Sequence, residues 1–168
     1  FLFKPAGFIA WLALVTTGLM LAVMPLQELT QGFTAQVLAA ENLILIALAY
    51  PFVKAIHELW HGYATKVCVC EVPEIGIMFH VFIPVPYVDA SSSAAFDSKW
   101  RRAVVGGAGI MVETALASIA MIIWLNAEPG LVRAFAFNVM LIGGVSTLLF
   151  NGNPLLRFDG YFVFADLI

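Results

Sequence analysis

The sequence predicts an all-α membrane protein with about four transmembrane helices and a short β-hairpin or sheet at the membrane surface, between the second and third helices. Of its 168 residues, 62% are hydrophobic and only 11% are charged, whereas soluble proteins carry about 25% charged residues. Four long apolar runs and one proline-containing stretch rich in β-branched and aromatic residues give this order. We treat residues 1–168 as one integral-membrane unit and expect it to be a fragment of a longer chain.

Each predicted span is long enough to cross the roughly 30 Å hydrocarbon core of a bilayer. We expect helices over residues 8–26, 43–66, 101–126 and 133–150. The second span contains Pro51, which removes one backbone hydrogen bond and bends a helix. Glycines recur in the third and fourth spans, and such small residues let helix backbones approach closely. We therefore expect the third and fourth spans to pack tightly against neighbouring helices.

Residues 72–89 differ in pattern from the spans. Residues 75–88 are rich in β-branched and aromatic side chains, and they include Pro84 and Pro86. Prolines do not suit a spanning helix, and in a sheet they confine a strand to the edge. We expect an extended hairpin that lies at the membrane surface or dips into it. An exposed edge of this kind can accept an extended peptide as an added strand.

The charges predict an orientation. One side of the membrane collects Lys4, Lys66, Lys99, Arg101, Arg102 and Arg157. The other collects only Arg133, while Lys54 lies within the second span. Because basic residues favour the cytoplasmic side, both ends of the chain, the hairpin and residues 151–162 are predicted to be cytoplasmic. A net charge of −3 without a basic cluster gives no reason to expect a nucleic-acid partner.

The most informative motif is His57-Glu58-Leu59-Trp60-His61, an H-E-x-x-H sequence in the second span. On a helix, positions i and i+4 share one face, so both imidazoles can bind one metal ion with Glu58 beside them. Such a zinc site keeps one position for a water whose pKa falls to about 7. The two histidines lie about 14 and 8 Å from the Lys66 end of the span. This predicts a zinc hydrolase site inside the bilayer, near its cytoplasmic side, with Glu58 as the base.

A catalytic zinc of this type needs a third protein ligand. The carboxylates within reach are Asp159, Asp89 and Glu113. Asp159 lies in an irregular segment that emerges on the histidine side, whereas Asp89 suits a turn before three serines. The third histidine, His80, lies in the β-like stretch, where packing or surface exposure is the simpler interpretation.

Glu113 is predicted to lie about 16 Å deep in the third span, close to the level of His57. A bare carboxylate at that depth is costly, so it should be neutral or paired. Our hypothesis is that Glu113 accepts the second N–H of a metal-bound histidine, which would fix the orientation of the ring.

The H-E-L-W-H motif, the glycine-rich third span and the later N-P-L-L-R-F-D-G sequence together resemble the site-2 protease class of intramembrane zinc metalloproteases. The likeness covers roughly residues 43–168. It is strongest with the large bacterial members that sit beside peptide-export or membrane-fusion components. The resemblance implies zinc bound by His57, His61 and Asp159, with Glu58 as general base.

The resemblance also implies an asparagine that contacts the substrate carbonyl. The family pattern Asn-x-x-Pro matches only loosely here, because the order is Asn151-Gly152-Asn153-Pro154. We favour Asn153 for this role, with Asn151 second.

The expected function is therefore zinc-dependent hydrolysis of a peptide bond in a membrane-embedded or membrane-adjacent peptide or protein. The resemblance implies a multi-pass protein of the bacterial inner membrane, with the lipid bilayer and a peptide substrate as partners. The alternative is a non-proteolytic membrane subunit of a peptide-export or maturation system that retains a metal site. A structural site has no use for a base, so Glu58 favours the enzyme.

Overall fold

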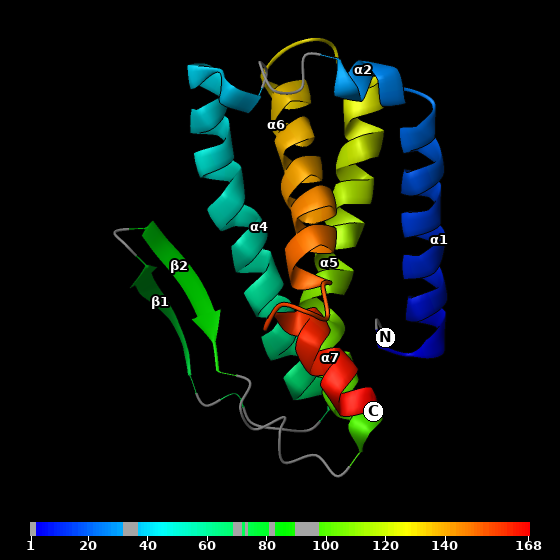
Figure 1. The fold of residues 1–168 in the computed structure, drawn as a ribbon, viewed down its shortest axis with the longest axis vertical. Coiled ribbons are helices and arrows are strands. Elements are labelled where there is room, and N and C mark those ends of the chain that lie inside the picture. The colour runs from blue at the N-terminus through cyan, green and yellow to red at the C-terminus, as the bar shows by residue number, and fades with distance from the viewer. Residues whose placement is uncertain (1–2, 32–36, 69–71, 73, 81–82, 90–97) are drawn as a thin grey trace.

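Four spans of the computed structural model are long and apolar enough to cross a membrane. They are α1 (Pro5–Val23), α4 (Ala40–Val67), α5 (Lys99–Asn126) and the continuous pair α6 (Leu131–Met140) and η2 (Leu141–Asn151). The structure describes residues 3–31, 37–68, 72, 74–80, 83–89 and 98–168. The spans stand side by side, and the start of α1 and the C-terminus lie toward the same end of the bundle (Figure 1). The predicted all-α membrane fold with a small sheet is confirmed.

The ends of the first span differ from the expected 8–26. Helix α1 begins at Pro5, where proline is favourable because the first helical N–H has no partner within the helix. It ends at Val23, shortly before Pro25, which cannot continue the helix. A short helix, α2 (Leu26–Thr30), follows at the far end of the bundle (Figure 1).

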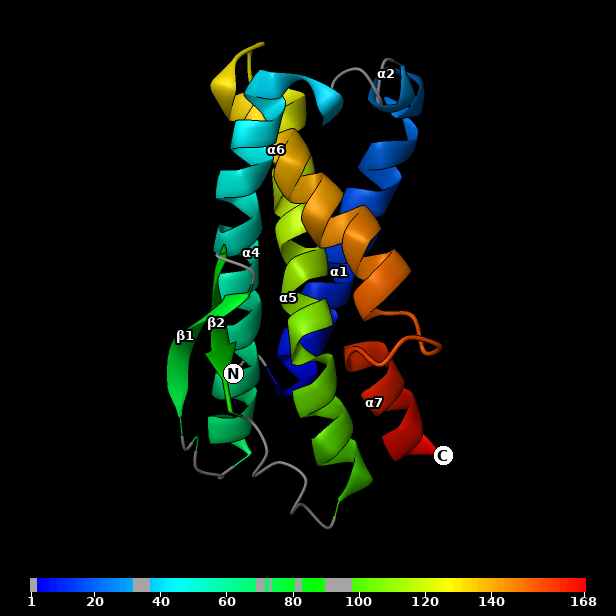
Figure 2. The ribbon, with the colours of Figure 1, turned by 60° about the vertical axis from the view of Figure 1, so that its left-hand side comes forward.

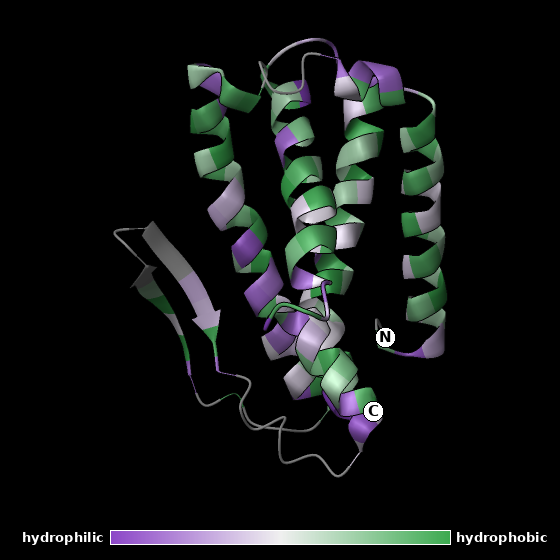
Figure 3. Cartoon of the chain, viewed as in Figure 1, coloured by the Kyte–Doolittle hydropathy of each residue, from purple (hydrophilic) through white to green (hydrophobic). Residues whose placement is uncertain are grey.

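Helix α5 is central, because it contacts α1, α4, α6, η2 and the last helix, α7 (Asp159–Leu167). The larger apolar cluster of the bundle consists of Ala49, Val53, Ala120, Met121, Trp124, Ala136, Phe137, Val139 and Ile142. A smaller cluster contains Ala64, Val105 and Ala108. Apolar residues dominate the spans, while hydrophilic residues gather on the lower half of α4 and near the turn into α7 (Figure 3). The histidine motif thus lies between two apolar clusters.

The predicted insertion at 72–89 is an antiparallel pair, β1 (Ile75–His80) and β2 (Ile83–Val88), in which Ile77 pairs with Pro86. Residues 73, 81 and 82 lie outside the described part. Strand β2 packs on α4, where a Cβ on Gly62 would lie 3.1 Å from Val88 Cγ1. The hairpin runs alongside the half of α4 that carries the histidines, with β1 on the outside (Figure 2).

Helix α6 continues into η2, an eleven-residue π-helix, a rare conformation that often occurs at functional sites. The Thr147 hydroxyl donates to the carbonyl of Ile142, five residues earlier, at 3.1 Å. A Cβ on Gly143 would lie 2.6 Å from the Glu113 carbonyl oxygen. The absence of this Cβ lets η2 approach α5 at Glu113.

After η2 the chain makes a turn, and α7 then packs along the lower part of α5, running toward the same end of the bundle as η2 (Figure 2). The first turn of α7 rests on the end of η2, since a Cβ on Gly160 would lie 2.6 Å from the carbonyl carbon of Gly152. At the other end of α7, Asp166 pairs with Arg102 of α5 at 2.7 Å. Asp159, the first residue of α7, is thereby brought back to the bundle.

Candidate metal centre

The two histidines belong to the buried face of α4. Ala49, Val53, His57, His61 and Thr65 recur every four residues and are all buried. Residues four apart share one face of a helix, so the apolar stripe that packs in the bundle also carries the imidazoles inward.

Both imidazoles direct Nε2 to the same point. His61 Nδ1 lies 2.8 Å from the Val105 carbonyl oxygen, which can only accept, so Nδ1 is the donor and His61 Nε2 is left unprotonated in the neutral ring. His57 Nδ1 lies 3.1 Å from Glu113 Oε1, an ion-pair distance without the angle of a well-formed hydrogen bond. The two Nε2 atoms are 3.2 Å apart.

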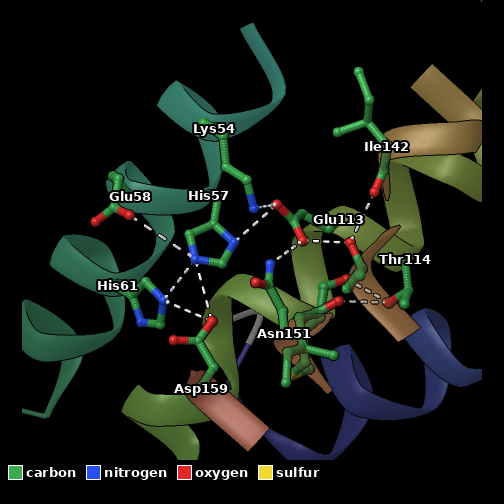
Figure 4. A network of polar contacts seen from close by, with 12 residues as sticks. Lys54, His57, Glu58, His61, Glu113, Thr114, Ile142, Asn151 and Asp159 are labelled. Carbon is green, nitrogen blue, oxygen red and sulfur yellow. Dashed lines mark hydrogen bonds and ion pairs between the residues drawn. The ribbon is translucent and has the colours of Figure 1, made fainter. Parts of the chain in front are cut away.

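Asp159 completes a group of three potential ligands (Figure 4). Its Oδ2 lies 3.2 Å from His57 Nε2 and 3.4 Å from His61 Nε2. Metal–ligand distances of 2.0–2.2 Å in a tetrahedral site place neighbouring ligand atoms about 3.3 Å apart. Oδ2 is also buried without a hydrogen-bond partner in the described part of the chain. The group can therefore hold a metal ion, and its spacing fits one.

The charge of Asp159 suits this role. Burial raises the pKa of its carboxyl, but the close contacts with the His57 and His61 imidazoles outweigh burial and hold the pKa below its usual range. Asp159 is also in the first turn of α7, where the helix dipole favours a negative charge. Both effects keep the carboxylate ionised, as a metal ligand must be.

Glu58 lies beside the group of three. Its Oε1 is 4.0 Å from His57 Nε2, and its side chain is 27% exposed, compared with 7% for His57. Figure 4 shows it on α4 with its carboxylate directed toward the imidazoles. The motif glutamate is thus near the potential ligands without being one of the closest three, as the sequence predicted.

Glu113 is fully buried and is paired, in agreement with the expectation from its depth. Lys54 Nζ lies 2.7 Å from Glu113 Oε1, and Asn151 Nδ2 donates to Oε2 at 2.8 Å. The Thr147 hydroxyl also donates to Oε2. Sequence reasoning placed Lys54 in the second span but did not pair it with Glu113. The similar depths of the two residues could have predicted this pair, because Lys54 lies about 18 Å from the Lys66 end of its span and Glu113 lies about 16 Å inside the third span.

The remaining candidates form hydrogen bonds outside the group of three potential ligands. Asn153 forms hydrogen bonds within its own turn, donating to the Leu149 carbonyl at 3.3 Å and accepting from the Leu155 N–H at 2.9 Å. Asp89 follows β2, and its N–H bonds the Glu74 carbonyl at the open end of the hairpin. The side chain of His80 is outside the described residues. Of the three proposed carboxylates, the structure brings Asp159 to the Nε2 atoms and Glu113 to Nδ1 of His57.

Comparison with known proteins adds no further assignment. The chain matches no family model, no curated protein and no solved structure.

Proposed function

We propose that this chain is the core of a zinc-dependent intramembrane endopeptidase. The observation that carries the proposal is the convergence of His57, His61 and Asp159, whose ligand atoms are 3.2–3.4 Å apart, with Glu58 next to them. Two imidazoles and one carboxylate are the donor set of many hydrolytic zinc sites and leave one coordination position open. Borderline nitrogen ligands favour zinc over magnesium or calcium, which prefer oxygen.

Zinc bound by these three side chains would supply a Lewis acid and lower the pKa of a coordinated water to about 7. Glu58 would accept a proton from the water as its oxygen attacks the peptide carbonyl carbon. The same carboxyl would then pass the proton to the leaving nitrogen as the C–N bond breaks. The products are a carboxylic acid and an amine, which become a carboxylate and an ammonium group by proton exchange, and Glu58 returns to its ionised form.

Asn153 remains our preferred residue for the developing negative charge on the carbonyl oxygen. Its amide donates to Leu149 at 3.3 Å, a long bond that a substrate oxygen can replace. Asn151 is less suited, because its amide already donates to the buried carboxylate of Glu113 at 2.8 Å. The choice between them rests on these competing hydrogen bonds.

The hairpin offers a way to present an extended substrate. Pro84 and Pro86 lack an N–H, and the register pairs them with Phe79 and Ile77. Opposed residues of antiparallel strands alternate between bonded and non-bonded pairs. Because Glu74 and Asp89 form a bonded pair, Ile77 and Phe79 are in non-bonded pairs and direct their N–H groups to the outer edge of β1. We infer that this outer edge binds the substrate as an added strand, because a helical substrate would hide its carbonyl groups.

The active site would face the cytoplasmic side of a bacterial inner membrane. Lys4, Lys66 and Lys99 lie at the helix ends nearest the histidines, whereas Arg133 lies at the opposite end of the bundle. Basic residues mark the cytoplasmic side. A fluorescent-protein fusion to the C-terminus, which folds only in the cytoplasm, tests this orientation.

The decisive experiment compares the native chain with Glu58→Gln. The probe is a fluorescent single-span peptide with an Asn-Pro pair in its apolar segment, which breaks the helix. We expect both proteins to contain about one zinc per chain, and only the native chain to cleave the peptide. A native chain that binds zinc without cleaving this probe would favour the non-proteolytic export or maturation subunit.

A further inference from the structure

Glu113 joins two helices through its two oxygens. Oε1 faces α4, where it contacts Lys54 Nζ at 2.7 Å and His57 Nδ1 at 3.1 Å. Oε2 faces η2, where it accepts from Asn151 at 2.8 Å and from the Thr147 hydroxyl. Figure 4 shows the carboxylate between Lys54 and His57 on one side and Asn151 on the other. Each oxygen is therefore committed to one helix.

The position of Lys54 explains why the carboxylate has this orientation. Lys54 precedes His57 by three residues on α4, so both side chains project from the same face. The ammonium and the imidazole meet the same oxygen of Glu113. This leaves Oε2 for the donors of η2, the helix that leads into the turn before Asp159.

Stability alone does not account for this pair. Removing an ammonium and a carboxylate from water is costly, and well-packed apolar residues are often at least as stabilising as a buried ion pair. The cost is greater still within a membrane span. The geometry offers another reason for the pair, because Lys54 holds the Glu113 carboxylate between His57 and η2.

We propose that Lys54 is a positioning residue of the metal centre. Its ammonium holds Glu113 so that Oε1 orients the His57 ring and Oε2 secures the end of η2. The Lys54–Glu113 pair thereby sets the relative position of His57 and the segment that carries Asp159. This inference rests on the metal-binding part of the proposed function and not on peptide hydrolysis.

The test measures zinc affinity in the full chain, purified in nanodiscs, by competition with a chelator. Lys54→Met keeps the length of the side chain and removes its charge, and it should weaken zinc binding about 10- to 100-fold, as loss of ligand-orienting partners does. Lys66→Met removes the same charge from an exposed position of α4 and serves as the control. Co²⁺-loaded Lys54→Met should also show an altered visible spectrum, because the ligand geometry changes.

A double variant separates the site from the fold. Lys54→Met leaves Glu113 buried without its counter-ion, which lowers the unfolding temperature, whereas Lys54→Met with Glu113→Gln removes both charges and should recover it. We expect the double variant to keep the weakened zinc affinity. Native affinity in either variant would overturn the inference, and so would a double variant that stays unstable, since the pair would then serve the fold alone.

The positioning role of Lys54 and the hydrolysis of peptides can fail separately. If the native chain binds no zinc, both fail together. If zinc binding weakens in the variants as expected while the native chain cleaves no peptide, Lys54 remains a positioning residue and only the hydrolytic function is lost.

Discussion

The imidazole ring of His57 lies directly against the backbone of Gly109. A Cβ built on Gly109 would lie 2.6 Å from both ring nitrogens of His57, which is closer than real Cβ contacts. Gly109 and Glu113 are four residues apart on α5 and therefore share a face. The glycine gives the ring its space, and the carboxylate contacts its Nδ1. Together they define the position of the His57 ring, one of the potential metal ligands.

Gly109→Ala should consequently displace the His57 ring and weaken zinc binding by at least about 10-fold, as loss of ligand orientation does. The matched control is Gly107→Ala on the same helix, where a Cβ would make an ordinary contact of 3.7 Å with Val163. Zinc affinity measured by chelator competition checks both variants. Equal affinity in the two would show that the ring does not need this position.

Much of the fold could be predicted because a membrane restricts the choices. A span needs about 20 apolar residues, and its backbone must satisfy its own hydrogen bonds. The expected helix at 43–66 is α4 (Ala40–Val67), and the one at 101–126 is α5 (Lys99–Asn126). The prolines at 84 and 86 predicted the hairpin for the same reason, since they suit neither a span nor a central strand.

The parts that could not be predicted depend on contacts between distant segments. The π-helix η2 has the composition of an ordinary span, and the close approach of its Gly143 to the Glu113 carbonyl is a contact with a distant segment. Asp159 was expected in an irregular segment, whereas it begins α7. The motif located His57 and His61, but the partners of Glu113 on η2 became apparent only in the folded chain.

The choice of the third ligand can be tested by metal content. Asp159→Ala removes an oxygen that lies within 3.4 Å of both Nε2 atoms, so zinc should fall from about one per chain to a small fraction. Asp89→Ala changes a carboxylate at the end of the hairpin and should leave zinc in place. Elemental analysis of the detergent-purified proteins distinguishes them. Loss of zinc in Asp89→Ala with retention in Asp159→Ala would reverse the assignment.

Arg102 and Asp166 form an ion pair that joins α5 to α7. Their contact is 2.7 Å long. Asp166 lies seven residues after Asp159, so the pair holds the far end of the same short helix. The pair opposes both helix dipoles, because arginine is near the start of α5 and aspartate near the end of α7. The stabilisation must therefore come from the pairing itself.

Arg102→Asp should weaken the docking of α7 and lower zinc affinity by up to about 5-fold, since partly exposed ion pairs contribute about 0.2–1 kcal/mol. Arg102→Asp combined with Asp166→Arg restores opposite charges and now agrees with both dipoles, so zinc affinity should return to the native value or exceed it. The measurement is zinc affinity in low salt. If the reversed pair does not recover zinc affinity, the ion pair has no role in docking α7 for zinc binding.

The outer edge of β1 provides a sharp test of substrate binding. The Ile77 N–H points away from β2, because the bonded pair of Glu74 and Asp89 sets the alternation and makes Ile77 and Pro86 a non-bonded pair. Ile77→Pro therefore removes a donor from the outer edge while the bonds between β1 and β2 remain. We expect cleavage of the fluorescent single-span peptide to fall at least about 10-fold, given that strand addition derives its affinity from main-chain hydrogen bonds.

Two comparisons make this outcome specific to the edge. Ile77→Ala removes most of a side chain that is 69% exposed but keeps the N–H, so cleavage should stay near the native rate. Zinc content should be unchanged in both variants, because none of the three potential ligands, His57, His61 and Asp159, lies in the hairpin. Native cleavage by Ile77→Pro would mean that the substrate reaches the metal without adding to β1, and loss of cleavage in Ile77→Ala alone would point to side-chain contacts instead.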